Sequence, residues 1–146
     1  MSRKTKKYIL LFILLLVAAG AAIGYYWYNK GPLDVKSSSA IKINAEELYD
    51  AYDKDSTAAG TKYTGKVLAV NGEVNEISLN QQQNKVLLLK TTSDLGFINC
   101  TLEETAENIR MGDKINIKGI CSGMGSGDAD LGIKGDVYLT RCYLEK

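Results

Sequence analysis

Apolar and polar positions divide this chain into two parts with different patterns. Residues 8–28 form an uninterrupted run without a charged side chain, whereas from residue 41 onward apolar residues recur at the spacings of short amphipathic helices and strands. At a rise of about 1.5 Å per residue, the 21 residues of this run make a helix about 30 Å long, which matches the hydrocarbon core of a bilayer. We therefore predict a transmembrane helix at 8–28.

The residues on either side of this run predict its orientation. Residues 1–7 contain four basic side chains and no acidic one, and such an excess marks the cytoplasmic side of a membrane. Residues 25–28 are aromatic, as is typical of a membrane–water interface. We expect 1–7 to be a cytoplasmic basic tail and the residues after the helix to lie outside the cytoplasm.

A cleaved signal peptide is the alternative reading of the same run, because Ala19-Gly20-Ala21 offers a small-residue cleavage site. The run is longer than a usual signal core and ends in bulky aromatic residues. We therefore favour an uncleaved anchor.

A linker and a helix are expected before the main domain. Residues 29–40 contain glycine, proline and three serines, which suits a flexible linker, and the domain then spans 41–146. Asn44 is a good N-cap and Glu47 stands at the third helical position, so a helix begins here. Its apolar residues share one face and are expected to pack against the domain. This stripe consists of Ala45, Leu48, Tyr49 and Tyr52.

Alternating apolar residues predict five strands in the rest of the domain. The first is long, and Gly72 in its middle suggests a bulge or a sharp bend. The first three strands form an antiparallel meander. The expected strands are 66–79, 85–91, 96–102, 113–121 and 136–144.

A further helix is predicted between the third and fourth strands, at about 102–111. Thr101 and Glu104 match a capping box, and Gly112 stands where a left-handed C-terminal residue belongs. A five-stranded Greek-key barrel with a helix at this point is the OB-fold. The predicted fold class is mainly β: a five-stranded OB-fold barrel with a helix between its third and fourth strands, a preceding helix and one N-terminal transmembrane helix. A β-sandwich of short strands is the alternative.

Four segments, in their order and spacing, resemble the tRNA_anti-like family over about residues 41–146. They are 45–52 (AEELYDAY), 63–72 (YTGKVLAVNG), 112–121 (GDKINIKGIC) and 136–142 (DVYLTRC). The resemblance implies an OB-fold domain of small bacterial envelope proteins, with a likeness to anticodon-binding domains. The resemblance supplies no catalytic residues. Together with the orientation predicted from the basic tail, it leads us to expect a protein of the bacterial inner membrane with the domain on the periplasmic side.

The charge distribution bears on the partner. The net charge is +1, but residues 31–146 have four more acidic than basic side chains. Because phosphate binding depends largely on basic groups, we favour a protein, peptide or glycan partner and keep single-stranded nucleic acid as the alternative. Ligand contacts are expected on the barrel face and its loops. The candidate residues are Gln82, Lys90, Phe97, Lys118, Lys134 and Arg141.

The three cysteines fall on the third, fourth and fifth predicted strands. A disulfide is allowed outside the cytoplasm, and two pairings stay open: Cys100 with Cys142, and Cys121 with Cys142. All three remaining free as small buried side chains is the other reading. A thiol-redox role would require an exposed cysteine with a lowered pKa.

No residue pattern predicts catalysis or a bound metal. Histidine is absent and no two cysteines form a C-x-x-C pair, which disfavours a zinc site and removes the usual general base. Asp128, Asp130 and Asp136 offer oxygens to calcium, but without the spacing of an EF-hand loop, so we expect a solvated loop. We therefore predict a non-catalytic binding module without a cofactor.

Overall fold

The computed structural model describes residues 3–29, 31 and 33–145 of the chain. They form two compact units, Met1–Asp34 and Val35–Lys146. Val35, which falls in the predicted linker, is buried and begins the second unit.

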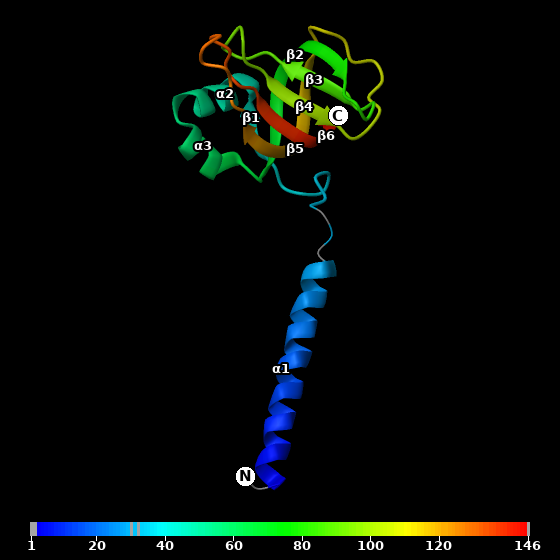
Figure 1. Ribbon diagram of the computed structural model, residues 1–146. Helices are drawn as coiled ribbons and strands as arrows, with labels where there is room; N and C mark the ends of the chain where they lie inside the picture. The colour runs from blue at the N-terminus through cyan, green and yellow to red at the C-terminus, as the bar shows by residue number, and fades with distance from the viewer. Residues whose placement is uncertain (1–2, 30, 32, 146) are drawn as a thin grey trace. The chain divides into compact units, whose positions relative to one another are not determined.

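The first unit contains helix α1, Arg3–Asn29 (Figure 1). Its segment Thr5–Asn29, 25 residues long, is a candidate membrane span by length and composition, and none of its most apolar stretch is buried against protein. The predicted helix at 8–28 is therefore confirmed as a helix. A membrane anchor and a signal sequence both have these properties.

The second unit is a closed five-stranded β-barrel (Figure 1). Its strands follow the order β2-β3-β4-β6-β5, and β5 pairs with β2 to close the ring. This confirms the predicted fold class and its five strands. The strands are β2 (Val67–Leu79), β3 (Lys85–Leu89), β4 (Ile98–Leu102), β5 (Lys114–Met124) and β6 (Val137–Glu145).

The first barrel strand bends where it changes partners. Residues 67–73 of β2 pair with β5, and residues 74–79 pair with β3, with a register shift between Val74 and Glu76. The irregularity therefore lies just after Gly72 rather than at it. A Cβ on Gly72 would lie 3.0 Å from the Ala45 Cβ and 3.1 Å from the Leu89 Cδ1, so the glycine allows helix and barrel to pack closely.

Three elements precede the barrel strands in the second unit. They are β1 (Ile41–Asn44), which pairs in parallel with β2, and helices α2 (Ala45–Lys54) and α3 (Ser56–Tyr63). In α2 the whole predicted stripe is buried, and the Glu47 carboxylate accepts a hydrogen bond from the Asn44 amide at 3.4 Å. Helix α3 and strand β1 were not predicted.

The predicted helix at 102–111 is wrong, because sheet pairing takes its first residues. Thr101 pairs with Val86 and Leu102 with Cys142, and the Glu103 amide donates to the Cys142 carbonyl at 3.0 Å. These residues continue the barrel wall, so they cannot begin a helix. Residues 103–113 form turns, in which Asn108 has a positive φ of 69°.

Candidate ligand-binding groove

A surface groove of about 490 Å³ lies on one face of the barrel. Leu88 of β3 and Tyr138 of β6 line it, together with the connection that precedes β4, and the loop at 125–136 forms one wall. OB domains bind ligands on this face, beside this loop. Its lining includes Leu88, Leu95, Phe97, Ile133, Lys134, Asp128, Asp136 and Tyr138.

Large apolar side chains are open to solvent in this groove. Leu95 is 57% exposed, Ile133 47% and Tyr138 42%, while Phe97 is half-buried. Tyr138 stands between two fully buried residues of β6, so strand alternation turns it outward. The groove therefore offers an apolar and aromatic surface that the barrel core does not use.

The wall at 125–136 is a hydrogen-bonded hairpin rather than an open loop. Asp128 and Ile133 exchange backbone hydrogen bonds of 2.8 and 2.9 Å. The Gly125 amide donates to the Asp136 carbonyl at 2.8 Å. A Cβ on Gly135 would overlap the Gly125 carbonyl, so glycine is required for the two arms to approach. The expected solvated loop is exposed, but its backbone is internally bonded.

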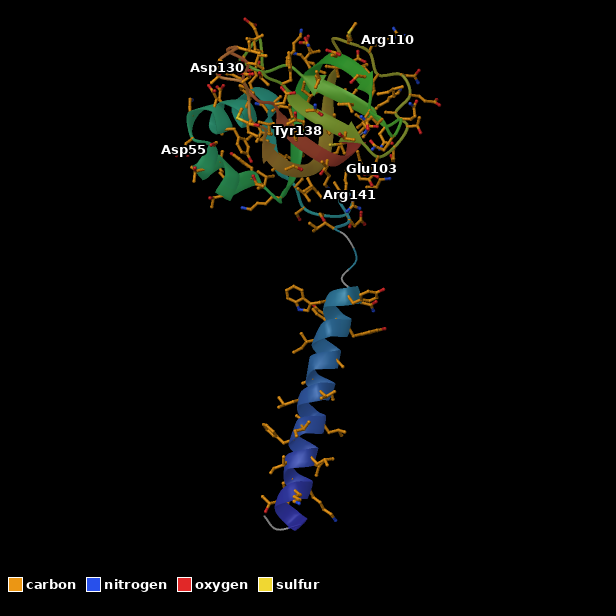
Figure 2. All side chains as sticks on the ribbon, in the orientation of Figure 1. Asp55, Glu103, Arg110, Asp130, Tyr138 and Arg141 are labelled. Carbon is orange, nitrogen blue, oxygen red and sulfur yellow. The ribbon has the colours of Figure 1, made fainter. Side chains whose placement is uncertain are left out.

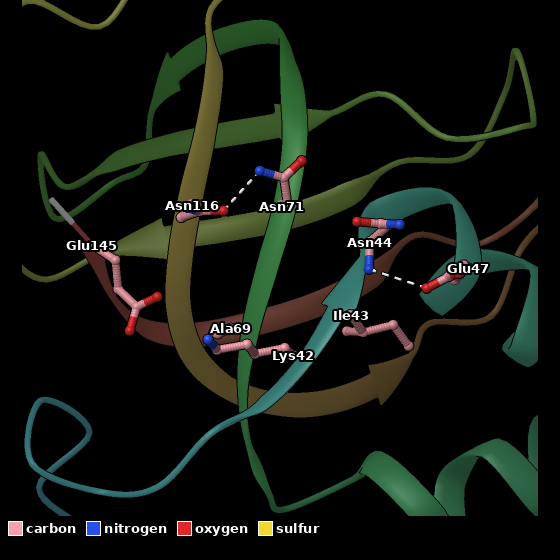
Figure 3. Close-up of a pocket in the computed structure, with 8 residues that line it drawn as sticks. All are labelled: Lys42, Ile43, Asn44, Glu47, Ala69, Asn71, Asn116 and Glu145. Carbon is pink, nitrogen blue, oxygen red and sulfur yellow. Dashed lines mark hydrogen bonds between the residues drawn. The ribbon is translucent and has the colours of Figure 1, made fainter.

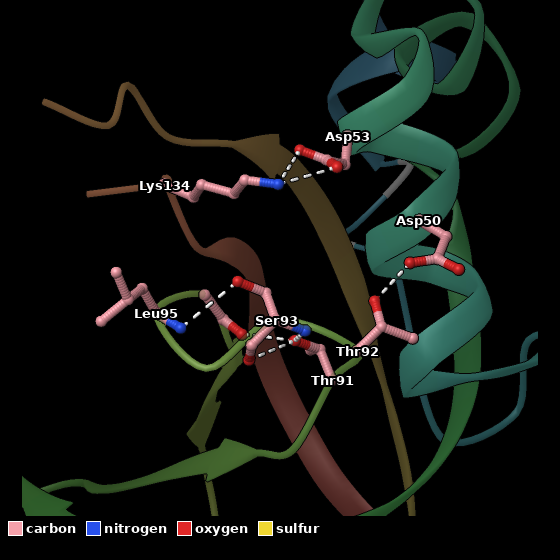
Figure 4. A network of polar contacts seen from close by, with 8 residues as sticks. Asp50, Asp53, Thr91, Thr92, Ser93, Leu95 and Lys134 are labelled. Atoms are coloured by element: carbon pink, nitrogen blue, oxygen red, sulfur yellow. Dashed lines mark hydrogen bonds and ion pairs between the residues drawn. The ribbon is translucent and has the colours of Figure 1, made fainter. Parts of the chain in front are cut away.

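Helix α2 holds the two segments that line the groove (Figure 4). The Lys134 ammonium donates to both oxygens of Asp53, at 3.0 and 2.9 Å. The Thr92 hydroxyl donates to the Asp50 carboxylate, which fixes the segment before Phe97. The hydrogen bond to Asp53 raises the pKa of Lys134. One helix face therefore positions both sides of the groove.

A second contact brings the same helix beneath the groove. A Cβ on Gly96 would overlap the Tyr49 hydroxyl, so the chain passes directly over this buried ring. The amide of the next residue, Phe97, donates to the Asp136 carboxylate at 3.0 Å. The position of Phe97 is therefore fixed by Tyr49, against which Gly96 packs, and by the hydrogen bond to Asp136.

The structure brings only two of the six predicted ligand-binding residues into this groove, Phe97 and Lys134. Lys90 instead pairs with Glu73, and that hydrogen bond lowers the pKa of the Glu73 carboxyl. The Lys118 ammonium donates to the Lys36 carbonyl at 3.0 Å. Gln82 is exposed in the 80–84 turn. Arg141, labelled in Figure 2, lies on β6 and is not one of the residues that line the groove.

Leu95, Ile133 and Tyr138 were missed by the sequence analysis. Alternation along β6 was the available signal for Tyr138. Leu95 and Ile133 lie in loops between strands, where the sequence has no alternating pattern from which the direction of a side chain could be predicted.

A second, polar depression of about 300 Å³ lies beside β1, β2 and β5 (Figure 3). Within it, the side-chain amide nitrogen of Asn71 donates a hydrogen bond to the side-chain oxygen of Asn116 at 2.7 Å. Lys42, Glu47 and Glu145 also line it. Its lining is hydrophilic and has no aromatic side chain.

All three cysteines are buried and free. The thiols of Cys100 and Cys142 are in hydrogen-bond contact, which together with burial raises the pKa of Cys100 well above its usual range. The Cys121 sulfur lies 3.4 Å from the Tyr52 hydroxyl oxygen. These surroundings are unlike those of a reactive thiolate, which needs exposure and a lowered pKa. Among the described residues, no group of three acidic or cysteine side chains is placed to hold a metal ion.

Comparison with known proteins adds a family. The family model described as tRNA_anti-like matches residues 1–131. No curated protein matches the sequence. A solved structure described as a putative aspartyl-tRNA synthetase from Leishmania major Friedlin is similar, with a TM-score of 0.44 and 7% identity. The match covers 78% of this chain and 22% of that one.

Proposed function

This chain belongs to the tRNA_anti-like family, and we propose on that premise that it is a non-catalytic binding module of the cell envelope. The family is one of binding domains rather than of catalysts. The ligand in this proposal is a segment of a protein, a peptide or a glycan. It lies in the groove beside β3 and β6.

The observation that carries this proposal is the exposed apolar lining of the groove. Leu95, Ile133 and Tyr138 are each more than a third exposed on one side of the barrel. A cluster of exposed apolar side chains beside polar loops is typical of a binding surface. The ion pair and hydrogen bond from α2 hold the walls in place, so the surface is preorganised for a ligand.

The proposed location follows from α1. Its basic N-terminal flank favours a cytoplasmic N-terminus and so supports our proposal that the barrel lies on the extracytoplasmic side of a bacterial inner membrane. A membrane anchor then keeps the groove near the membrane surface, where envelope proteins and glycans are abundant.

A defined panel of ligands tests the proposal. Full-length chain in uncharged detergent micelles is titrated into labelled peptides, oligosaccharides and single-stranded oligonucleotides, and fluorescence anisotropy is followed. We expect saturable binding of one class that Leu95→Ser weakens by about tenfold, since the groove loses part of its apolar surface. Met111→Ser is the matched control, because Met111 is also exposed but lies outside the groove.

Two results would contradict this function. In one, no class of ligand binds saturably. In the other, binding is equally strong in the Leu95→Ser and Met111→Ser variants, which would place the ligand elsewhere on the molecule.

Single-stranded nucleic acid is the second candidate ligand. Phe97 and Tyr138 both line the groove, and nucleobases stack on such rings. Two of the predicted ligand-binding lysines, Lys90 and Lys134, are already paired with carboxylates, which leaves fewer cations for phosphate groups. A salt series distinguishes the candidates, because phosphate contacts give binding that weakens steeply with salt.

A further inference from the structure

The two segments that line the groove are acidic. Residues 91–97 and 125–136 contain four aspartates, Asp94, Asp128, Asp130 and Asp136, and a single lysine, Lys134. Asp128 and Asp136 line the groove itself, and Asp94 and Asp130 are exposed in the same segments. Lys134 does not neutralise these aspartates, because its ammonium group is already paired with the Asp53 carboxylate.

The hydrogen bonds within these segments leave the negative charge in place. Asp136 accepts from the Phe97 amide, and Asp128 accepts from the amides of Asp130 and Leu131. Neutral amide donors orient a carboxylate without cancelling its charge. Because charges interact over about 8 Å at physiological ionic strength, neighbouring carboxylates on one rim act together on a ligand.

The apolar lining of the groove and its acidic rim, formed by these four aspartates, together favour a ligand with two properties. Leu95, Ile133 and Tyr138 offer apolar surface, while the rim attracts positive charge and repels phosphate. A peptide that carries lysine or arginine beside a large apolar side chain has both properties. A neutral glycan uses only the aromatic surface, and a polynucleotide meets repulsion.

We propose that this groove binds a positively charged peptide segment of a partner protein, with an apolar side chain against Leu95, Ile133 and Tyr138 and its cations at the aspartate rim. This inference rests on the proposed function and specifies the ligand class. It assigns Asp94 and Asp130 to long-range attraction, since no side-chain bond ties either of them to the loops that carry them.

The test compares peptide probes that differ in charge. Full-length chain in uncharged detergent micelles is titrated into a labelled peptide of alternating lysine and leucine, its glutamate-for-lysine counterpart, and labelled oligo-dT. Empty micelles correct for binding to detergent. We expect the lysine peptide to bind about tenfold or more tightly than the glutamate peptide, and to weaken with added salt.

Paired charge variants locate the effect. Asp94→Asn with Asp130→Asn should weaken binding of the lysine peptide by about threefold or more, because two rim charges are lost. Glu103→Gln with Glu107→Gln removes the same charge from the exposed 103–113 segment and should change binding by less than about twofold. Circular dichroism checks that both double variants remain folded.

The outcomes separate this inference from the function beneath it. The charge inference is wrong if both double variants bind the lysine peptide equally well. It is also wrong if the glutamate peptide or oligo-dT binds more tightly than the lysine peptide and Leu95→Ser abolishes that binding. In both cases the groove remains the binding site. If no probe responds to Leu95→Ser, both the inference and the proposed function fail.

Discussion

Tyr52 joins helix α2 to the end of α3 and to the barrel. Its hydroxyl oxygen lies 2.8 Å from the Thr64 hydroxyl and 3.4 Å from the Cys121 sulfur, and its ring centroid is 6.4 Å from that of Tyr63. Burial, followed by the Cys121 contact, raises the pKa of Tyr52 to about 12. The folded state therefore favours the neutral phenol over a wider pH range than the unfolded chain does.

This pKa makes alkaline stability depend on Tyr52. Its contribution is fully present below about pH 10, the ordinary pKa of tyrosine, and is lost as pH rises through about 12. Tyr52→Phe should cost about 1 kcal/mol at pH 8, because Thr64 and the buried Cys121 each lose a hydrogen-bond partner. Between those pH values it should then lose stability less steeply than the wild type. Guanidinium denaturation across the pH range measures both effects.

The control for this titration is Tyr138→Phe, which changes an exposed tyrosine and should follow the wild-type slope. Parallel pH profiles for wild type and Tyr52→Phe would contradict a raised pKa at Tyr52.

At the residue scale, the sequence predicts burial better than it predicts the site. The stripe of α2, from Ala45 to Tyr52, is recognisable because helical spacing alone puts it on one face. Phe97 was identified, but its neighbours Leu95 and Ile133 were not. Their proximity depends on a hairpin and a connection folding toward each other, and no local pattern encodes that.

At the scale of elements, α2 braces the groove as well as covering the barrel. The pair between Lys134 and Asp53 is about half exposed on both sides, so it should add little to global stability. Its effect should instead be local. Because this pair bonds the hairpin at 125–136 to α2, opening of the hairpin should depend on it.

Asp53→Ala should therefore loosen the hairpin without unfolding the domain. We expect little change in the free energy of unfolding, because the pair is solvent-screened, together with about threefold or faster amide exchange at Asp128 and Ile133, whose mutual bonds close the hairpin. Hydrogen–deuterium exchange with mass spectrometry measures the second effect. Lys54→Ala, on the same helix, should leave both amides unchanged. Unchanged amide exchange in Asp53→Ala would mean that the hairpin's own backbone hydrogen bonds keep it closed without the ion pair to α2.

Elements were predictable where one local signal dominated. The five strands alternate clearly, and all five exist. The segment at 102–111 has a capping pattern as well as a place in a strand, and the pairing of Leu102 with Cys142 prevails. Helix α3 has a cap in Asp55, which accepts from the amides of Thr57 and Ala58, but no apolar periodicity long enough to reveal it.

At the scale of the whole molecule, the proposed function requires that α1 stays attached to the barrel. If α1 anchors the chain, the proposed groove stays at the membrane; if α1 is a cleaved signal sequence, the barrel is released. The sequence predicts the apolar helix firmly because its signal is 21 uncharged residues in succession. Composition alone does not separate an anchor from a signal sequence, since both use the same apolar side chains.

Intact mass and extraction separate the two outcomes. We expect the chain expressed in bacteria to stay in the membrane pellet after an alkaline carbonate wash and to keep the mass of residues 1–146, because the apolar run matches the bilayer and its aromatic end suits the interface. Cleavage after Ala21 would instead give a soluble chain without its first 21 residues. Ala18→Arg places a charge near the centre of the run, at a cost of about 3 kcal/mol, and should shift protein out of the membrane fraction. Ala18→Leu keeps the run apolar and should not. If Ala18→Arg stays fully in the pellet, the barrel rather than α1 holds the molecule at the membrane.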